Sequence, residues 1–307
     1  MFMIEPSLPQ LFICDLVLCY DDSYEYSNCS TQKAFHMSLP VRSEIAIPPS
    51  HSARSGNLAI LAAGLWLLWA VLLSAGLIVD RLSFVNASGY SAIGRLGSSL
   101  VLVAAGWCWF ANFRLTSLAA YAGLVALGMS LGALGDFFNA GLLQSLIPLP
   151  NPVLGGIAAF GLGHLAYIRG CFDARRRAGL RLGSRWWAAV LAWQLVAAVS
   201  WYWIVLSTAN ESLRVLVWPA LAYSLLLAGT AGVATGLAVQ DRRFAILAVG
   251  SALFLISDLV LAWGMFRGSF PFRTQAVWIP YSGGQMLIVY AIFFFRSALS
   301  SARQSLS

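Results

Sequence analysis

The sequence predicts an all-α, polytopic membrane helix bundle with about eight transmembrane helices. Of its 307 residues, 59% are hydrophobic and only 10% are charged, and the mean hydropathy is +0.76. The apolar residues gather in long runs, whereas most charges, prolines and asparagines fall in the breaks between the runs or in the tails. A soluble globular enzyme is excluded, because its surface would need many more charged residues.

Each expected helix is an apolar run that approaches the length needed to cross the hydrocarbon core of a bilayer. In chain order the runs lie at approximately residues 58–79, 97–112, 117–139, 153–171, 186–207, 213–237, 245–266 and 277–296. They are separated by breaks at Asp80–Gly94, Asn112–Thr116, Pro148–Pro152, Arg175–Arg185, Thr208–Ser212, Asp241–Arg243 and Arg267–Arg273. Each break holds charges, Pro or Asn, which a spanning segment expels. The second run is the shortest.

The chain before the first run has a different composition. Residues 1–56 mix Pro, Ser, acidic residues and Tyr without a period, and the apolar piece Leu11–Cys19 contains Asp15 and is too short to span a bilayer. We expect a mobile N-terminal tail over 1–56, in which Met37 is a plausible alternative start. A single membrane domain follows over 57–297, and residues 298–307 form a C-terminal tail.

The basic residues predict the orientation of the helices. Both tails and the second, fourth and sixth loops hold fourteen of the nineteen Arg and Lys residues, and the other four loops hold five. Both termini should therefore be cytoplasmic. The net charge of +7 is thus a topology signal, and we expect no nucleic-acid partner. The preference for Arg over Lys is typical of a GC-rich bacterial genome, which favours a bacterial inner (plasma) membrane.

Two further classes of site are excluded by residue types. The single Lys, Lys33, lies outside every expected span, so no span supplies the Schiff-base Lys of a retinal-binding pump. The five Cys residues show neither the spacing of metal ligands nor a convincing disulfide set. We therefore expect neither a metal nor a cofactor.

Two acidic residues and one His lie inside the apolar runs, and they are the best guide to function. The acidic residues there are Asp136 and Asp258, and His164 has a similar setting. Such side chains cost several kcal/mol at bilayer depth unless they are paired or hydrated, so they indicate an internal functional cavity. The alternative is a polar clamp between helices. Gly128 and Gly132 form a Gly-x-x-x-Gly pair on the face that carries Asp136, which should bring this Asp against neighbouring helices.

Other polar side chains share faces with these residues. Tyr167 follows His164 by three positions, and Gln285 follows Tyr281 by four, so each pair lies on one helix face. Taken alone, Tyr281 fits an interfacial aromatic anchor and Gln285 a packing hydrogen bond. Because separate burial in hydrocarbon would be costly, we expect the two Asp residues, His164, Tyr281 and Gln285 to line one cavity.

Four segments resemble the YhhN family of membrane lysoplasmalogenases. They are Gly123-Leu-Val-Ala-Leu-Gly-Met-Ser-Leu-Gly-Ala-Leu-Gly-Asp136, Phe160-Gly-Leu-Gly-His164-Leu-Ala-Tyr167, Ala252-Leu-Phe-Leu-Ile-Ser257-Asp258 and Pro280-Tyr281-Ser-Gly-Gly-Gln285. Each is weak alone, but the four follow the family's order over about Gly97 to Phe295. The chain departs from the family at Phe137-Phe138-Asn139, where an aliphatic run usually follows the Gly-Asp pair. This difference affects the expected choice of substrate.

The resemblance implies hydrolysis of the vinyl ether bond of a lysoplasmalogen, which releases a fatty aldehyde and a glycerophospho-headgroup. It implies catalytic roles for Asp136, Asp258 and His164, and substrate-binding roles for Tyr281, Gln285, Tyr167 and Ser257. The substrate would be a lysophospholipid or another enol-ether lipid taken from the bilayer.

The residues suit this chemistry. A vinyl ether is cleaved by protonation of a carbon atom, and water then attacks the resulting oxocarbenium ion. The reaction needs a neutral acid and a base or anion, and two carboxyl groups in different environments supply both without a metal. His164 would relay a proton or orient the charged Asp. The sequence does not say which Asp is the acid.

Two other classes use acids inside the membrane. A multi-pass transporter would use them for proton coupling, although no repeat is evident between the halves of the chain. An intramembrane aspartyl protease also needs two Asp residues, and Pro219-Ala220-Leu221 mimics one of its motifs. That tripeptide precedes Asp258 instead of following both Asp residues, and Ala133 stands where a Gly-x-Gly-Asp motif needs Gly.

Overall fold

The computed structural model describes residues 51–82, 86–208 and 210–301. Within these ranges, eight helices are long and apolar enough to cross a membrane. The predicted fold class is therefore confirmed, and the chain is a multi-pass membrane protein. Most of the predicted N-terminal tail, with Met37, lies outside the described residues.

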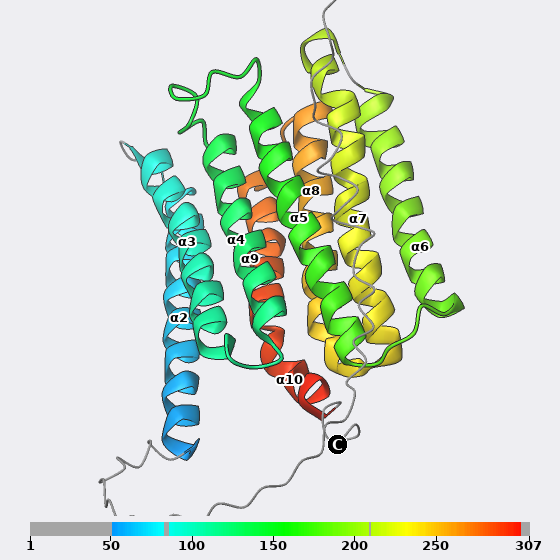
Figure 1. Cartoon of the computed structure of the whole chain (residues 1–307). Helices are drawn as coiled ribbons and strands as arrows, with labels where there is room; N and C mark the ends of the chain where they lie inside the picture. Colours follow the sequence, from blue (N-terminus) through cyan, green and yellow to red (C-terminus); the bar gives the residue numbers. More distant parts are fainter. Residues whose placement is uncertain (1–50, 83–85, 209, 302–307) are drawn as a thin grey trace, which may run out of the picture. The chain divides into compact units, whose positions relative to one another are not determined.

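Most of the helices follow one another through short connections, and a longer loop joins α4 to α5 (Figure 1). They are α2 (His51–Val79), α3 (Ala87–Phe113), α4 (Ala119–Asn139), α5 (Pro152–Arg177), α6 (Ser184–Trp201), α7 (Val217–Gln240), α8 (Ala245–Phe266), α9 (Arg273–Tyr290) and α10 (Ile292–Ser301). The π-helical turn η1 (Tyr202–Leu206) extends α6, and the 3₁₀ turns η2 (Glu211–Leu216) and η3 (Arg242–Phe244) lead into α7 and α8.

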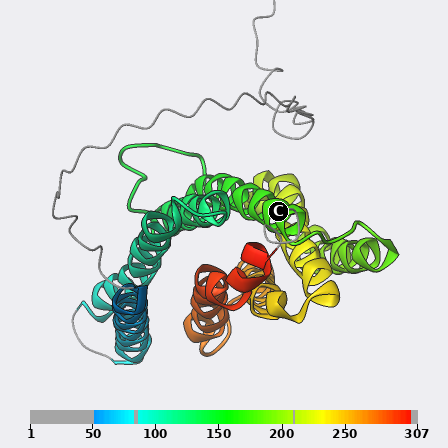
Figure 2. The same ribbon diagram turned by 60° about the horizontal axis from the view of Figure 1, so that its bottom comes forward.

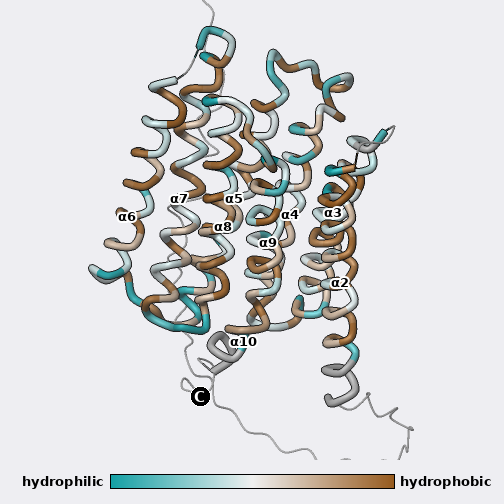
Figure 3. The backbone as a smooth tube through the Cα atoms, turned by 180° about the vertical axis from the view of Figure 1, so that it is seen from behind, coloured by the Kyte–Doolittle hydropathy of each residue, from teal (hydrophilic) through white to brown (hydrophobic). Residues whose placement is uncertain are grey.

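The spanning helices of residues 51–301 pack as an arc with two helices on its inner side (Figure 2). Neighbours along the arc are α2, α3, α4, α5, α7 and α6, and α9 contacts α2, α3, α4 and α8. Hydrophobic residues dominate the helices, and hydrophilic residues gather in the connections between them (Figure 3). The inner helices α8 and α9 thus carry Asp258 and Tyr281 toward α4, which carries Asp136.

The α4–α5 pair packs as its small residues predict. A Cβ atom on Gly163 would lie 2.9 Å from the carbonyl oxygen of Gly128, so both backbones approach where a larger residue would not fit. This contact orients the face of α4 that also bears Asp136.

Several predicted boundaries were wrong, and two of these errors concern charged residues. Helix α3 begins at Ala87, so it includes both Gly94, which was assigned to the preceding break, and Arg95, which lies before the predicted start at residue 97. Helix α5 continues to Arg177 and contains a third acidic residue, Asp173. In each case a nearby opposite charge reduces the cost of a charged residue in a spanning helix. Arg95 pairs with Asp80 at 3.2 Å, and Arg177 with Asp173 at 2.7 Å.

Candidate functional site

A polar cavity of about 200 Å³ lies among α3, α4, α5, α8 and α9. Its polar and aromatic wall is formed by Arg95, Asp136, Asn139, Phe160, Asp258, Trp278 and Tyr281. The two carboxyl groups, which lie far apart in the sequence, therefore face one space. The predicted meeting of Asp136, Asp258 and Tyr281 is confirmed.

Asp136 lies near the C-terminal end of α4 and is held by two hydroxyl groups. The Tyr281 hydroxyl donates to its Oδ1 at 2.8 Å, and the Ser99 hydroxyl donates to its Oδ2 at 2.7 Å. The donors come from α9 and α3, so three helices fix one carboxyl group. Only 6% of Asp136 is exposed. A carboxyl group that accepts at both oxygens is suited to carrying a negative charge.

Asp258 lies in α8 and has a different set of contacts. The Tyr223 hydroxyl of α7 donates a short hydrogen bond to its Oδ2. Its Oδ1 accepts no hydrogen bond from the residues that the structure describes, and Asp258 is only partly buried. One oxygen of Asp258 is therefore available to hold a proton and to present it to a bound molecule.

A second cavity, of about 80 Å³, adjoins Asp258 on another side. It lies among α5, α6, α7 and α8, and most of its wall is apolar, including Ile204, Leu227 and Met265. Asp258 and Leu261 line both cavities. The carboxyl group of Asp258 thus stands at the boundary between a polar space and an apolar space.

Two of the predicted site residues lie outside the polar cavity. His164 is buried, with its Nδ1 2.9 Å from the Thr230 hydroxyl, and its ring centroid lies 4.6 Å from that of Phe254. Gln285 is 1% exposed and packs beside Gly132. Neither the Nε2 atom of His164 nor the Gln285 amide has a hydrogen-bond partner among the described residues. The expectation that all five polar residues line one cavity is wrong for these two.

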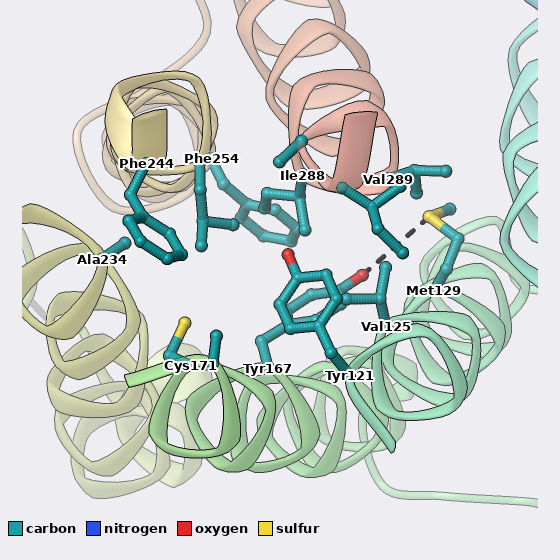
Figure 4. Close-up of a cluster of buried hydrophobic side chains, with 14 of the residues drawn as sticks. Tyr121, Val125, Met129, Tyr167, Cys171, Ala234, Phe244, Phe254, Ile288 and Val289 are labelled. Carbon is teal, nitrogen blue, oxygen red and sulfur yellow. Dashed lines mark hydrogen bonds between the residues drawn. The ribbon is translucent and has the colours of Figure 1, made fainter. Parts of the chain in front are cut away.

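Tyr167 and Ser257 are also absent from the residues that line the polar cavity. Tyr167 points into the hydrophobic cluster between α4, α5 and the inner helices, where its hydroxyl lies 4.0 Å from the Met129 sulfur (Figure 4). The Ser257 hydroxyl donates to the Val277 carbonyl at 2.9 Å. Ser257 therefore joins α8 to α9 beside Asp258, and it can position that residue without touching a ligand.

Sequence reasoning did not identify several residues of the site, among them Ser99, Tyr223 and Arg95. Arg95 lies in the first turns of α3, which were left out of the predicted helix, and Ser99 lies inside the predicted run but carries no sequence signal that distinguishes it from other Ser residues. Tyr223 is the only Tyr of α7, and a phenol inside an otherwise apolar run was a usable signal because a buried hydroxyl needs a partner. Among the described residues, no three His, Cys, Asp or Glu side chains are grouped to hold a metal ion.

These features define a multi-pass helical membrane protein with two carboxyl groups on one internal cavity. The chain belongs to the YhhN family, whose model matches residues 95–292. The match includes both Asp residues and, apart from Ala92, every residue that lines the polar cavity. No curated protein and no solved structure matches the chain.

Proposed function

We propose that the protein is a membrane hydrolase that cleaves the vinyl ether bond of lysoplasmalogens. The YhhN family includes lysoplasmalogenases. The observation that carries the proposal is the unequal environment of the two carboxyl groups on one cavity. Asp136 accepts hydrogen bonds at both oxygens, and Asp258 accepts at one. One group suits a base or anion and the other suits an acid, which is the division of roles that this reaction needs.

In the first step, Asp258 donates its proton to the carbon of the double bond that lies farther from the ether oxygen. The vinyl ether becomes an oxocarbenium ion, and the negative charge of Asp136 stabilises it. Water then adds to the carbon next to oxygen while Asp136 accepts a proton from that water. The product of this step is a hemiacetal.

In the second step, Asp136 returns its proton to the glycerol oxygen, and Asp258 accepts the hydroxyl proton of the hemiacetal. The carbon–oxygen bond breaks, which releases the fatty aldehyde and the glycerophospho-headgroup. Both carboxyl groups regain their starting protonation states, and the net reaction consumes one water. Tyr281, Ser99 and Tyr223 hold the two acids through this cycle. His164, Gln285, Tyr167 and Ser257 act as positioning residues, since none of them lines the polar cavity.

The test is incubation of the purified protein with a lysoplasmalogen in D₂O, with analysis of the released aldehyde. Protonation at carbon from an exchangeable Asp places one deuterium next to the aldehyde carbon. The saturated alkyl-ether analogue, which has no double bond to protonate, should release nothing. A protein that is folded but releases no aldehyde from any lysoplasmalogen would overturn the proposed function.

We place the hydrocarbon chain of the substrate in the apolar cavity, because the vinyl ether joins directly to that chain. Ala220 of α7 lines this cavity, and Ala220→Phe should fill part of it. We expect turnover of long-chain lysoplasmalogens to fall more than turnover of short-chain ones, measured as kcat/KM across a chain-length series. Val239→Phe, at a position of the same helix that is 52% exposed, is the matched control. Equal losses for all chain lengths would show that the chain lies elsewhere.

A proton-coupled transporter is the second candidate, and one observation favours it. Pro280 lies inside α9, next to Tyr281, and a Pro at that position interrupts the helical hydrogen bonds beside the acidic cavity. Broken helices at a central site are typical of transporters. Proton uptake into liposomes driven by a lysolipid, without aldehyde release, would support this function over hydrolysis.

We propose that both termini lie in the cytoplasm of a bacterial cell, because the tails and the even-numbered loops hold most of the Arg and Lys residues. Asp136 lies near the end of α4 that joins the loop to α5, and this loop is on the side poorer in Arg. The polar cavity should therefore open toward the outer half of the membrane.

A reporter fused after Arg296 is expected to be active only if it is of the cytoplasmic type. Activity of an extracytoplasmic reporter at this site would reverse the topology.

A further inference from the structure

Arg95 is a charged residue of the polar cavity for which the catalytic cycle gives no role. Its Nη1 atom donates to Asp80 at 3.2 Å and to Ser91 at 2.8 Å. Among the described residues, neither Nε nor Nη2 has a hydrogen-bond partner, and Nε is buried. The guanidinium carbon lies 5.4 Å from the centroid of the Trp278 ring. One edge of the guanidinium is thus held in place, and the other is unused.

The fold holds this side chain rigidly. Helices α2 and α3 cross where a Cβ atom on Gly94 would lie 2.7 Å from the Cα atom of Gly76. Gly94 directly precedes Arg95, so the close crossing fixes the backbone that carries the guanidinium. Asp80, near the end of α2, then fixes its outer edge. The side chain of Arg95 is 17% exposed, and the residue lines the same cavity as Asp136 and Asp258.

We propose that Arg95 binds the phosphate group of a lysophospholipid through the Nε–Nη2 edge of its guanidinium. This proposal rests on the proposed function and adds the residue that recognises the headgroup. Arg binds phosphate oxygens through two parallel N–H donors, and this edge supplies both. Trp278 covers one face of the guanidinium, which limits its movement.

The position of Arg95 also explains how one substrate fits both cavities. The phosphate lies at Arg95, the vinyl ether lies between Asp136 and Asp258, and the hydrocarbon chain continues into the apolar cavity beyond Asp258. A neutral alkenyl glycerol would lack the contact with Arg95. The protein should therefore prefer phosphate-bearing ethers over neutral ones, and the preference should depend on this residue.

Binding is measured with saturated alkyl ethers, so that the test does not depend on turnover. The ligands are an alkyl lysophospholipid and the matching alkyl glycerol without phosphate, titrated into detergent-solubilised full-length protein by calorimetry. Arg95→Gln is expected to raise the Kd of the phospholipid about 10–100-fold, which is the effect of losing hydrogen bonds to a charged group. The Kd of the alkyl glycerol should hardly change. Arg95→Lys keeps the charge without the two-donor edge and should give an intermediate loss.

Asp80→Asn separates binding from a structural role, because it removes the ion pair and leaves the guanidinium. This variant should keep the preference for the phosphate ligand. If Arg95→Gln weakens both ligands equally, or neither, Arg95 is a structural residue and the proposal is wrong. The outcome is independent of the proposed hydrolysis. Preserved phosphate discrimination without aldehyde release would overturn the enzyme alone, and aldehyde release without discrimination would overturn the phosphate site alone.

Discussion

Asp258→Asn and Asp136→Asn are each expected to abolish the release of aldehyde while leaving a folded protein. Asn keeps the shape of Asp and most of its hydrogen bonds, but it cannot donate or accept the proton that each step requires. General acid–base groups contribute about 10²–10⁴ in rate, so the loss in kcat should be at least of this order. The measurement is aldehyde release by protein purified to the same monodispersity as the wild type.

Asp173→Asn is the matched control for these variants. Asp173 also lies in a spanning helix, but it pairs with Arg177 and does not line the polar cavity. The control should retain a rate close to that of the wild type.

His164→Ala should lose less activity than either Asp variant, because His164 lies outside the cavity and acts through its neighbours. An Asn variant at 136 or 258 with wild-type turnover would reduce that Asp to a packing clamp.

The fold could be predicted from the sequence because the cost of burying charge can be read along the chain, one residue at a time. A spanning run must exclude charge along its length, and eight such runs are visible without knowledge of their neighbours. The same reasoning failed at α3, because it treated Arg95 as a residue that must leave the membrane. Asp80 is distant enough in the chain to be invisible as its partner, yet the two side chains meet at 3.2 Å.

The candidate site could be predicted only in part, for a similar reason. Asp136 and Asp258 were identified because an acidic residue in an apolar run usually belongs to a functional site. His164 and Gln285 were expected in the same cavity because burying a polar side chain in hydrocarbon is costly. A neutral imidazole or amide can, however, be buried against a hydroxyl or a glycine instead. Asp136 accepts two hydroxyl donors because Ser99 of α3 lies beside it. The register of α3 against α4 is set by helix packing, which the sequence does not show.

Gly284→Ala is expected to destabilise the protein through the crossing of α8 and α9. A Cβ atom at Gly284 would lie 2.6 Å from the carbonyl oxygen of Gly250 and 2.9 Å from the Phe254 nitrogen. Both are backbone atoms, so α8 must move away from α9. Overpacking of this kind costs about 1–3 kcal/mol. Phe254 lies one turn from Asp258, and the movement should therefore also lower aldehyde release.

Gly283→Ala is the control, because a Cβ atom at Gly283 would have no heavy atom within 4 Å. That substitution adds a better helix former by about 0.5–1 kcal/mol and should raise stability slightly. The Tm of Gly284→Ala in detergent should lie about 5 °C or more below that of Gly283→Ala. Two variants with the same Tm and the same rate would mean that α8 and α9 are not held at this distance. The position of Asp258 on the polar cavity, beside Tyr281, would then need another explanation, because this position depends on the close approach of α8 and α9.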